Sequence, residues 1–173
     1  VIATQNPLDL VGTYPLPTPQ LDRFLFKISM DHIDREAELE VLDSIKERKR
    51  LLGNQNKVNR DDVLKARETI FTQINIDQAI KTTLVDISTN LRKDERVLQG
   101  NSTRSMVLLL PALQVRAAIR GRSYVSSEDI ENLIPEVLNH RIELVPGVND
   151  FDKVLQDNME RPLEELAKST ITK

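Results

Sequence analysis

The chain has 173 residues, no cysteine and a formal net charge of −3, and 39% of its residues are hydrophobic but only 3% aromatic. The lack of cysteine excludes disulfide frameworks and thiolate metal sites, and the acidic balance lacks the basic excess typical of nucleic-acid-binding domains. No apolar run approaches the roughly 18 residues of a membrane span, and no signal-peptide pattern opens the chain, so we expect a cytoplasmic protein. A core built from aliphatic residues predicts helices packed on helices.

The beginning of the chain predicts a short α/β segment, with a strand, a loop, a short helix and a second strand. Residues 1–3 are apolar, as in a strand buried on both faces, and Pro7 ends this strand because proline has no N–H for a β-ladder. Asn6 therefore stands at the carboxyl end of a core strand, the edge at which open α/β sheets bind ligands. The short helix starts near Pro19, and residues 25–30 predict the second strand.

From residue 31 onward the sequence turns helical. Five helices are expected, which start near Asp34, Asn59, Asp77, Ser102 and Ser126, with Asp34 and Asn59 as N-caps. Ser126 with Asp129 three positions on also resembles a capping box. A sixth helix is expected over residues 150–168. Apolar residues recur at helical spacing in these segments, most clearly at Ile80, Leu84, Ile87 and Leu91.

Three prolines lie inside the helical patterns. A proline in a helix interior removes a backbone hydrogen bond and clashes with the preceding turn, at a cost of ~3 kcal/mol. We therefore expect Pro111 to kink its helix or to force a restart near residue 110, Pro135 to bend the next helix, and Pro162 to interrupt the last one. The basic run at residues 46–50 is interpreted as a complement to a helix dipole, with a nucleic-acid patch as the alternative.

Three polar residues could carry chemistry, and each has a structural alternative. Asn6 could orient a water against a phosphate oxygen, or it could form the turn before Pro7. Arg23 could stabilise charge on a transferring phosphoryl group, as arginine fingers do, or it could pair with Asp22 or another acid on the surface. Arg104 lies in the first turn of a helix, where a cation opposes the helix dipole. That position favours an anionic ligand, although an ordinary surface arginine would fit it equally well.

The combination of these residues with their neighbours is more specific than any one of them. Ala-Thr-Gln-Asn-Pro at 3–7, Gly-Thr-Tyr-Pro-Leu-Pro at 12–17 and Gln-Leu-Asp-Arg-Phe at 20–24 follow one another in this order. Together with Arg104, residues 118–130 and the Val-Leu-Asn-His-Arg run at 137–141, this pattern strongly resembles the MoxR family of AAA+ ATPases. The resemblance covers about residues 1–145.

The resemblance implies a role for each candidate residue. In that family the asparagine at the strand end is sensor 1, which would place Asn6 beside the γ-phosphate and the attacking water. Arg23 would be an arginine finger acting on the ATP of a neighbouring subunit. Arg104 would be sensor 2, which contacts an ATP phosphate and couples nucleotide state to lid position. Two positions depart from the family pattern, because Val11 replaces an acidic residue and Thr103 replaces a proline; neither removes a charged catalytic group.

The parts that are missing also shape the prediction. A P-loop needs a glycine followed by lysine, and none of the five glycines has one; no apolar run ending in paired acids supplies a Walker B strand either. We expect a mainly α fold, in which a helical AAA+ lid bundle follows a short α/β remnant of a P-loop ATPase core. The expected domains are residues 1–30 for the remnant, 31–145 for the lid and 146–173 for a helical tail. The chain alone should neither bind Mg-ATP tightly nor hydrolyse it.

By the same resemblance, the intact protein is expected to be an ATPase that uses ATP and Mg²⁺. It would assemble into a ring, taken as a hexamer, and would remodel or mature an unknown client protein as a chaperone does. Two alternatives stay open. One is a non-enzymatic helical interaction module, in which Asn6, Arg23 and Arg104 are all structural. The other is a related AAA+ branch of the magnesium chelatase or MCM helicase type.

Overall fold

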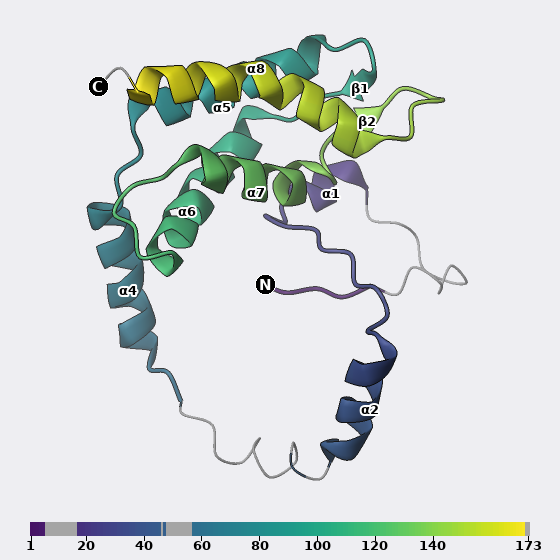
Figure 1. Cartoon of the computed structure of the whole chain (residues 1–173), viewed down its shortest axis with the longest axis vertical. Coiled ribbons are helices and arrows are strands. Elements are labelled where there is room, and N and C mark those ends of the chain that lie inside the picture. Colours follow the sequence, from purple (N-terminus) through teal and green to yellow (C-terminus); the bar gives the residue numbers. More distant parts are fainter. Residues whose placement is uncertain (6–16, 46, 48–56, 172–173) are drawn as a thin grey trace.

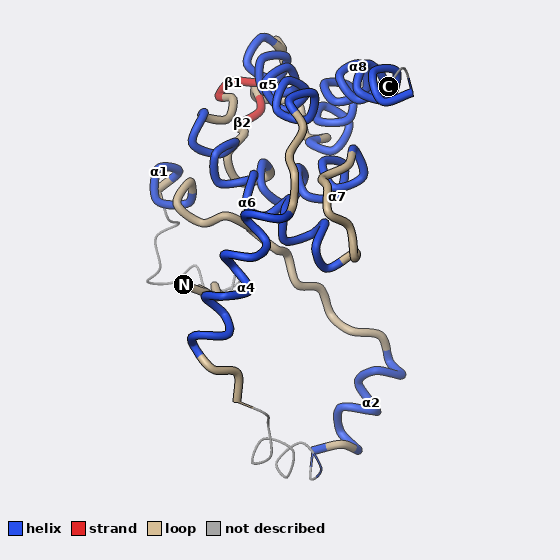
Figure 2. The backbone as a smooth tube through the Cα atoms, turned by 90° about the vertical axis from the view of Figure 1, so that its left-hand side faces the viewer, coloured by secondary structure: helices blue, strands red, loops and turns tan. Residues whose placement is uncertain are grey.

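The computed structural model describes residues 1–5, 17–45, 47 and 57–171, and in this part of the chain it is mainly helical (Figures 1 and 2). The helical fold class expected from the sequence is confirmed. The described elements, in chain order, are α1 (Thr18–Leu21), α2 (Arg35–Asp43), α4 (Arg60–Gln73), α5 (Gln78–Lys93), β1 (Val97–Gln99), α6 (Thr103–Ile119), α7 (Ser127–Leu138), β2 (Glu143–Leu144) and α8 (Phe151–Ile171).

Four of these helices, α5 to α8, form the bundle that holds the core. α5 packs against α8 and α6 packs against α7, with α7 also in contact with α8. The apolar stripe predicted for α5 is confirmed, since Ile80, Leu84, Ile87 and Leu91 are all at most 4% exposed. Burial of one such side chain contributes about 1.5–3 kcal/mol, so packing of these faces, rather than helix propensity, stabilises the bundle.

The three prolines inside helices do not break them. α6 continues through Pro111, α7 through Pro135 and α8 through Pro162. The expected interruption at Pro162 and the restart near residue 110 are therefore wrong. Each proline removes only one backbone hydrogen bond, and the burial of apolar side chains on both sides of it offsets that loss.

Residues near the N-terminus form no strand in the described part of the chain. Residues 1–5 and 25–34 are irregular, and the expected strands at 1–3 and 25–30 are not formed. A strand needs a paired neighbour for its backbone N–H and C=O groups, and no strand among the described residues pairs with these segments. The described two-stranded sheet instead lies within the helical part, where β1 and β2 pair antiparallel with Val97 opposite Leu144.

α2 and α4 extend away from the bundle (Figure 1), and neither contains a buried residue. The predicted cap of α2 is confirmed, since Asp34 accepts a hydrogen bond of 2.8 Å from the backbone N–H of Ala37. α4 meets the bundle through its contact with α6. α8, in contrast, belongs to the bundle through α5 and α7, although the division into three domains stays a prediction.

Two polar networks fix the ends of the bundle. The predicted capping box at α7 is confirmed, with the Ser126 N–H donating to Asp129 at 2.9 Å. Asp129 is fully buried and also accepts hydrogen bonds from Arg122 at 2.7 and 2.8 Å. At the other end, Asp94 accepts from Arg96 at 2.7 Å and from Asn158 at 2.6 Å, which ties the start of the sheet to α8.

Candidate functional site

Arg104 lies in the first turn of α6, on the face opposite to the core. The N-cap of this helix is Ser102, in an extended conformation, and Arg104 is exposed. The buried residues of α6 include Leu109 and Leu113, whereas Arg104 shares its face with Val107 and Pro111, three and seven positions on. Its side chain forms no hydrogen bond or ion pair within the described residues. A guanidinium near the positive end of a helix, without a partner there, is available to an anionic ligand.

Arg23 lies directly after α1 and is also exposed. Its backbone N–H donates to Gln20 at 3.3 Å and closes the end of the short helix. The structural alternative for Arg23 is an ion pair with Asp22 or with another acidic residue. In the structure, the Asp22 carboxylate pairs with Arg141 instead, at 2.8 Å, and the Arg23 side chain has no partner among the described residues.

Arg141 is the residue that holds the backbone on both sides of Arg23. Its side chain is 1% exposed, yet it follows α7 by only three residues. It donates to the backbone carbonyls of Asp22 at 3.1 Å, Leu25 at 3.0 Å and Phe24, as well as to that of Val137 in α7. A buried guanidinium without partners would be strongly unfavourable. These acceptors compensate for the loss of water around Arg141 and so allow its side chain to be buried.

The segment at residues 22–27, here called the docked segment, has further contacts with α7 and the residues that follow it. His140 bonds through Nε2 to the Phe24 carbonyl at 3.0 Å, and the Lys27 N–H donates to the Glu136 carbonyl at 3.3 Å. Since a carbonyl can only accept, Nε2 of His140 carries the proton in this bond. The docked segment is therefore held by the end of α7.

The docked segment also contacts the start of α6, which carries Arg104. The Ser105 hydroxyl donates to Asp22 at 3.4 Å, and the same hydroxyl lies 3.3 Å from that of Ser102. Asp22 and Ser105 are the sequence neighbours of Arg23 and Arg104. The structure thus brings together the backbones that carry these two predicted residues, 81 positions apart in the sequence.

Asn6, the third predicted site residue, lies outside the described residues, and its role stays a prediction. Sequence reasoning missed Asp22, His140 and Arg141 as parts of this site. The one available signal was that residues 137–141 end in His-Arg and belong to the family-like pattern, but nothing local showed that these side chains would be buried.

Burial lowers the pKa of His140 below its ordinary value of 6.5, and the charge of Arg141 acts in the same direction, against the hydrogen bond to Phe24. The other ring nitrogen, Nδ1, is buried without a partner in the described part of the chain. A second proton on the ring would therefore be placed on a buried nitrogen with no acceptor, next to a guanidinium. His140 stays neutral at pH 7, and its Nε2–H contact with the docked segment is preserved.

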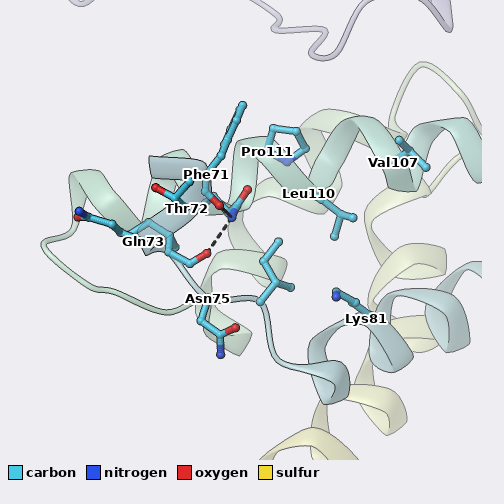
Figure 3. A pocket seen from close by; sticks show the side chains of 11 residues that line it. Phe71, Thr72, Gln73, Asn75, Lys81, Val107, Leu110 and Pro111 are labelled. Carbon is cyan, nitrogen blue, oxygen red and sulfur yellow. Dashed lines mark hydrogen bonds between the residues drawn. The ribbon is translucent and has the colours of Figure 1, made fainter. Parts of the chain in front are cut away.

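A pocket of about 530 Å³ lies beside the same face of α6 (Figure 3). Figure 3 shows Leu110 and Pro111 of α6 on one side and Asn75, in the connection from α4 to α5, on the other. Gln114 donates to the Ile74 carbonyl at 2.8 Å and joins the two walls. Lys81 is the one charged residue among those that line it. The pocket continues the exposed face of α6 that begins with Arg104.

Within the described residues, no group of three His, Cys, Asp or Glu side chains is arranged to hold a metal ion. No described helix is long and apolar enough to cross a membrane. The described site offers two exposed guanidinium groups, those of Arg23 and Arg104, on segments that are in contact.

Two family models match the chain. Residues 1–26 match the ATPase family associated with various cellular activities (AAA), and residues 89–162 match the AAA lid domain. The first match contains Asn6 and Arg23, and the second contains Arg104 and Arg141.

The chain is similar to two curated bacterial proteins. It is 38% identical over 151 residues to the protein YeaC of Bacillus subtilis, covering 84% of this chain and 45% of that one. It is 34% identical over 155 residues to the chaperone MoxR1 of Mycobacterium tuberculosis, covering 83% of this chain and 40% of that one. The chain thus spans less than half the length of these curated relatives.

One solved structure shares the fold. A protein assigned as an ATPase, from Cytophaga hutchinsonii, superposes with a TM-score of 0.76 at 28% sequence identity. The match covers 90% of this chain and 51% of that one. The arrangement of lid and preceding segment seen here therefore also occurs in a larger protein.

Proposed function

Because the chain belongs to the MoxR type of AAA+ proteins and has the fold of their C-terminal region, we propose that it supplies part of an ATP site in a longer protein. In this proposal Arg23 is an arginine finger that stabilises the charge on the transferring phosphoryl group of a neighbouring subunit's ATP. Arg104, as sensor 2, contacts a phosphate of that ATP. Asn6, as sensor 1, orients the attacking water beside its own subunit's γ-phosphate.

The observation that carries this proposal is the placement of Arg23 and Arg104. Both are exposed, both lack a partner among the described residues, and the Ser105–Asp22 hydrogen bond of 3.4 Å joins the backbones beside them. Two exposed cations on segments joined in this way offer two positive groups to a polyanion such as ATP. The alternative in which both arginines are structural provides no such partner for either.

The residues of this site suit the phosphates of ATP but not the Mg²⁺ ion. The guanidinium groups are suited to phosphate oxygens, whereas the described residues provide no carboxylate cluster for a metal. We place the ligands of Mg²⁺ and the P-loop in the remainder of the longer protein. Mg²⁺ would neutralise charge on the phosphates there, while the residues of this chain bind, orient and sense the nucleotide.

The role of the intact protein follows from this arrangement. An arginine finger that acts on a neighbour's ATP requires at least two adjoining subunits, and we propose a ring of six identical subunits. Nucleotide-dependent movement of the lid would remodel or mature a client protein, as a chaperone does; MoxR1, one of the relatives, is named a chaperone. The identity of the client and the cytoplasmic location stay predictions.

The test is ATP turnover by the full-length protein with Arg23→Ala, compared with Arg120→Ala as a matched control. Arg120 is exposed at the opposite end of α6, and its side chain forms no hydrogen bond or ion pair within the described residues. Loss of the finger should lower kcat by about 10³-fold or more while the Kd for Mg-ATP stays within a few-fold of the wild type. If nucleotide binding fell as much as turnover, Arg23 would be a ground-state binding residue and the proposal would be wrong.

A further inference from the structure

We propose that Arg141 is a positioning residue, which fixes the direction of Arg23 and makes the finger move together with the start of α6. This inference rests on the proposed function, and it names how that site is regulated. The lid contributes Arg141 and Ser105, and the finger belongs to the segment before the lid. A change in lid position would therefore change where the finger points.

The contacts of Arg141 surround Arg23 on both sides. Arg141 donates to the carbonyl before Arg23, at Asp22, and to the carbonyls of the two residues after it, Phe24 and Leu25. The peptide groups on either side of a residue determine the direction of its Cα–Cβ bond. Arg141 thus holds the backbone of Arg23 without any contact with its side chain, and it leaves that side chain exposed.

Burial and charge make this attachment specific for arginine. The Arg141 side chain is 1% exposed, and its Nε donates to the Asp22 carboxylate at 2.8 Å, so its charge is compensated. A lysine at this position could keep the ion pair, but its single ammonium group could not reach carbonyls in several directions at once. His140 adds a further bond to the Phe24 carbonyl at 3.0 Å from the neighbouring position.

Asp22 connects this attachment to the helix of Arg104. The same Oδ1 atom that accepts from Arg141 accepts from Ser105 at 3.4 Å. The Asp22 carboxylate therefore accepts from Arg141, three residues after the end of α7, and from Ser105 in the first turn of α6. If sensor 2 shifts α6 when the nucleotide changes, the docked segment is drawn with it, and the finger is repositioned at the neighbouring site.

The test is a double-mutant cycle in the full-length protein, with Arg23→Ala, Arg141→Met and the two combined. Arg141→Met alone should lower kcat by about a hundredfold, the loss that a misplacement of roughly 1 Å can cause, with the Kd for Mg-ATP unchanged. Added to Arg23→Ala, it should have no further effect on kcat, because a positioning residue has nothing left to position. Arg141→Lys should fall between the wild type and Arg141→Met.

The outcomes separate this inference from the proposed function. If Arg23→Ala keeps wild-type turnover, the finger itself is wrong. If Arg23→Ala is inactive but Arg141→Met keeps wild-type kcat, or if the double variant loses a further hundredfold, Arg141 does not act through Arg23 and the inference is overturned. Should Arg141→Met fail to fold, Asp22→Asn replaces it in the cycle: it keeps an acceptor but removes the charge, and the same non-additivity with Arg23→Ala is expected.

Discussion

Arg141 and Asp22, which are 119 positions apart in the sequence, form an ion pair of 2.8 Å in which the arginine side chain is 1% exposed and the aspartate side chain 27% exposed. This contact attaches the segment that precedes the lid to the end of α7. It explains why a charged residue can be buried there, and why Arg23, the neighbour of Asp22, has no part in the pair.

The first prediction concerns the stability of this attachment. Asp22→Ala would leave the Arg141 guanidinium buried without its counter-charge, and removal of one partner of a buried pair costs about 3–5 kcal/mol. Because Asp22 is partly exposed, we expect the lower end, about 3 kcal/mol, in urea unfolding of the 173-residue chain. Glu165→Ala, which breaks an exposed pair with Arg161 at 2.9 Å, should cost less than about 1 kcal/mol. Equal losses for the two variants would contradict the buried role of Arg141.

The second prediction concerns pH. Burial holds the pKa of His140 below its unfolded value of 6.5, so the unfolded chain binds a proton more readily than the folded one. The stabilisation by neutral His140 is fully present above pH 6.5 and is lost as the pH falls from there toward the lower, folded pKa. Urea unfolding between pH 7.5 and pH 5 should therefore show a stability slope that His140→Gln reduces.

The matched control for the pH experiment is His32→Gln, because His32 is exposed in the irregular segment before α2. It should keep the wild-type slope. If both variants reduce the slope equally, or if neither does, the burial of His140 is not what links pH to stability.

Much of the fold could be predicted from local patterns, because helices are local structures. The stripe that begins at Ile80 and the capping box at Ser126 and Asp129 are properties of a few adjacent turns, and both are confirmed. The expected break at Pro162 was wrong because tertiary burial, which no local pattern contains, outweighs one missing hydrogen bond. The strand at residues 25–30 was wrong because a strand depends on a partner elsewhere.

The site shows the same division. Arg23 and Arg104 could be identified from the residues around them, and their exposure agrees with a role toward a ligand. The segments that carry them are joined by the hydrogen bond between Ser105 and Asp22, which are 83 positions apart. A contact over such a separation cannot be predicted from the local sequence. From the sequence, Arg141 resembles an ordinary exposed arginine that follows a helix. Only the structure shows that its side chain is buried. Asn6 lies outside the described residues and stays a prediction.

The third prediction concerns Arg104. In the full-length protein, Arg104→Ala should weaken Mg-ATP binding by about 1.5–3 kcal/mol, the range for hydrogen bonds to charged groups, or roughly 10- to 150-fold in Kd. Its thermal midpoint without nucleotide should stay within about 1 °C of the wild type, since an exposed side chain without partners contributes little to folding. Arg120→Ala, at the other end of α6, should change neither value. An unchanged Kd for Arg104→Ala would contradict the sensor 2 role.

The fourth prediction concerns the 173-residue chain by itself. It has no glycine followed by lysine and hence no P-loop, so it should not bind Mg-ATP tightly in isothermal titration and should not release phosphate from ATP. The full-length protein, measured under the same conditions, should do both. Turnover by the purified 173-residue chain that exceeds the buffer control would contradict the assignment of phosphate and metal binding to the remainder of the protein.

The central claim is that Arg23 acts on the ATP of a neighbouring subunit, and mixed assemblies of full-length chains test it most directly. Arg23→Ala chains would keep an intact ATP site, and Asn6→Ala chains would keep an intact finger. Each variant alone should be nearly inactive. In rings assembled at random from equal amounts, about a quarter of the subunit boundaries would join an intact finger to an intact site, so the mixture should recover up to roughly a quarter of wild-type turnover. No recovery in rings shown to contain both chains would contradict the claim.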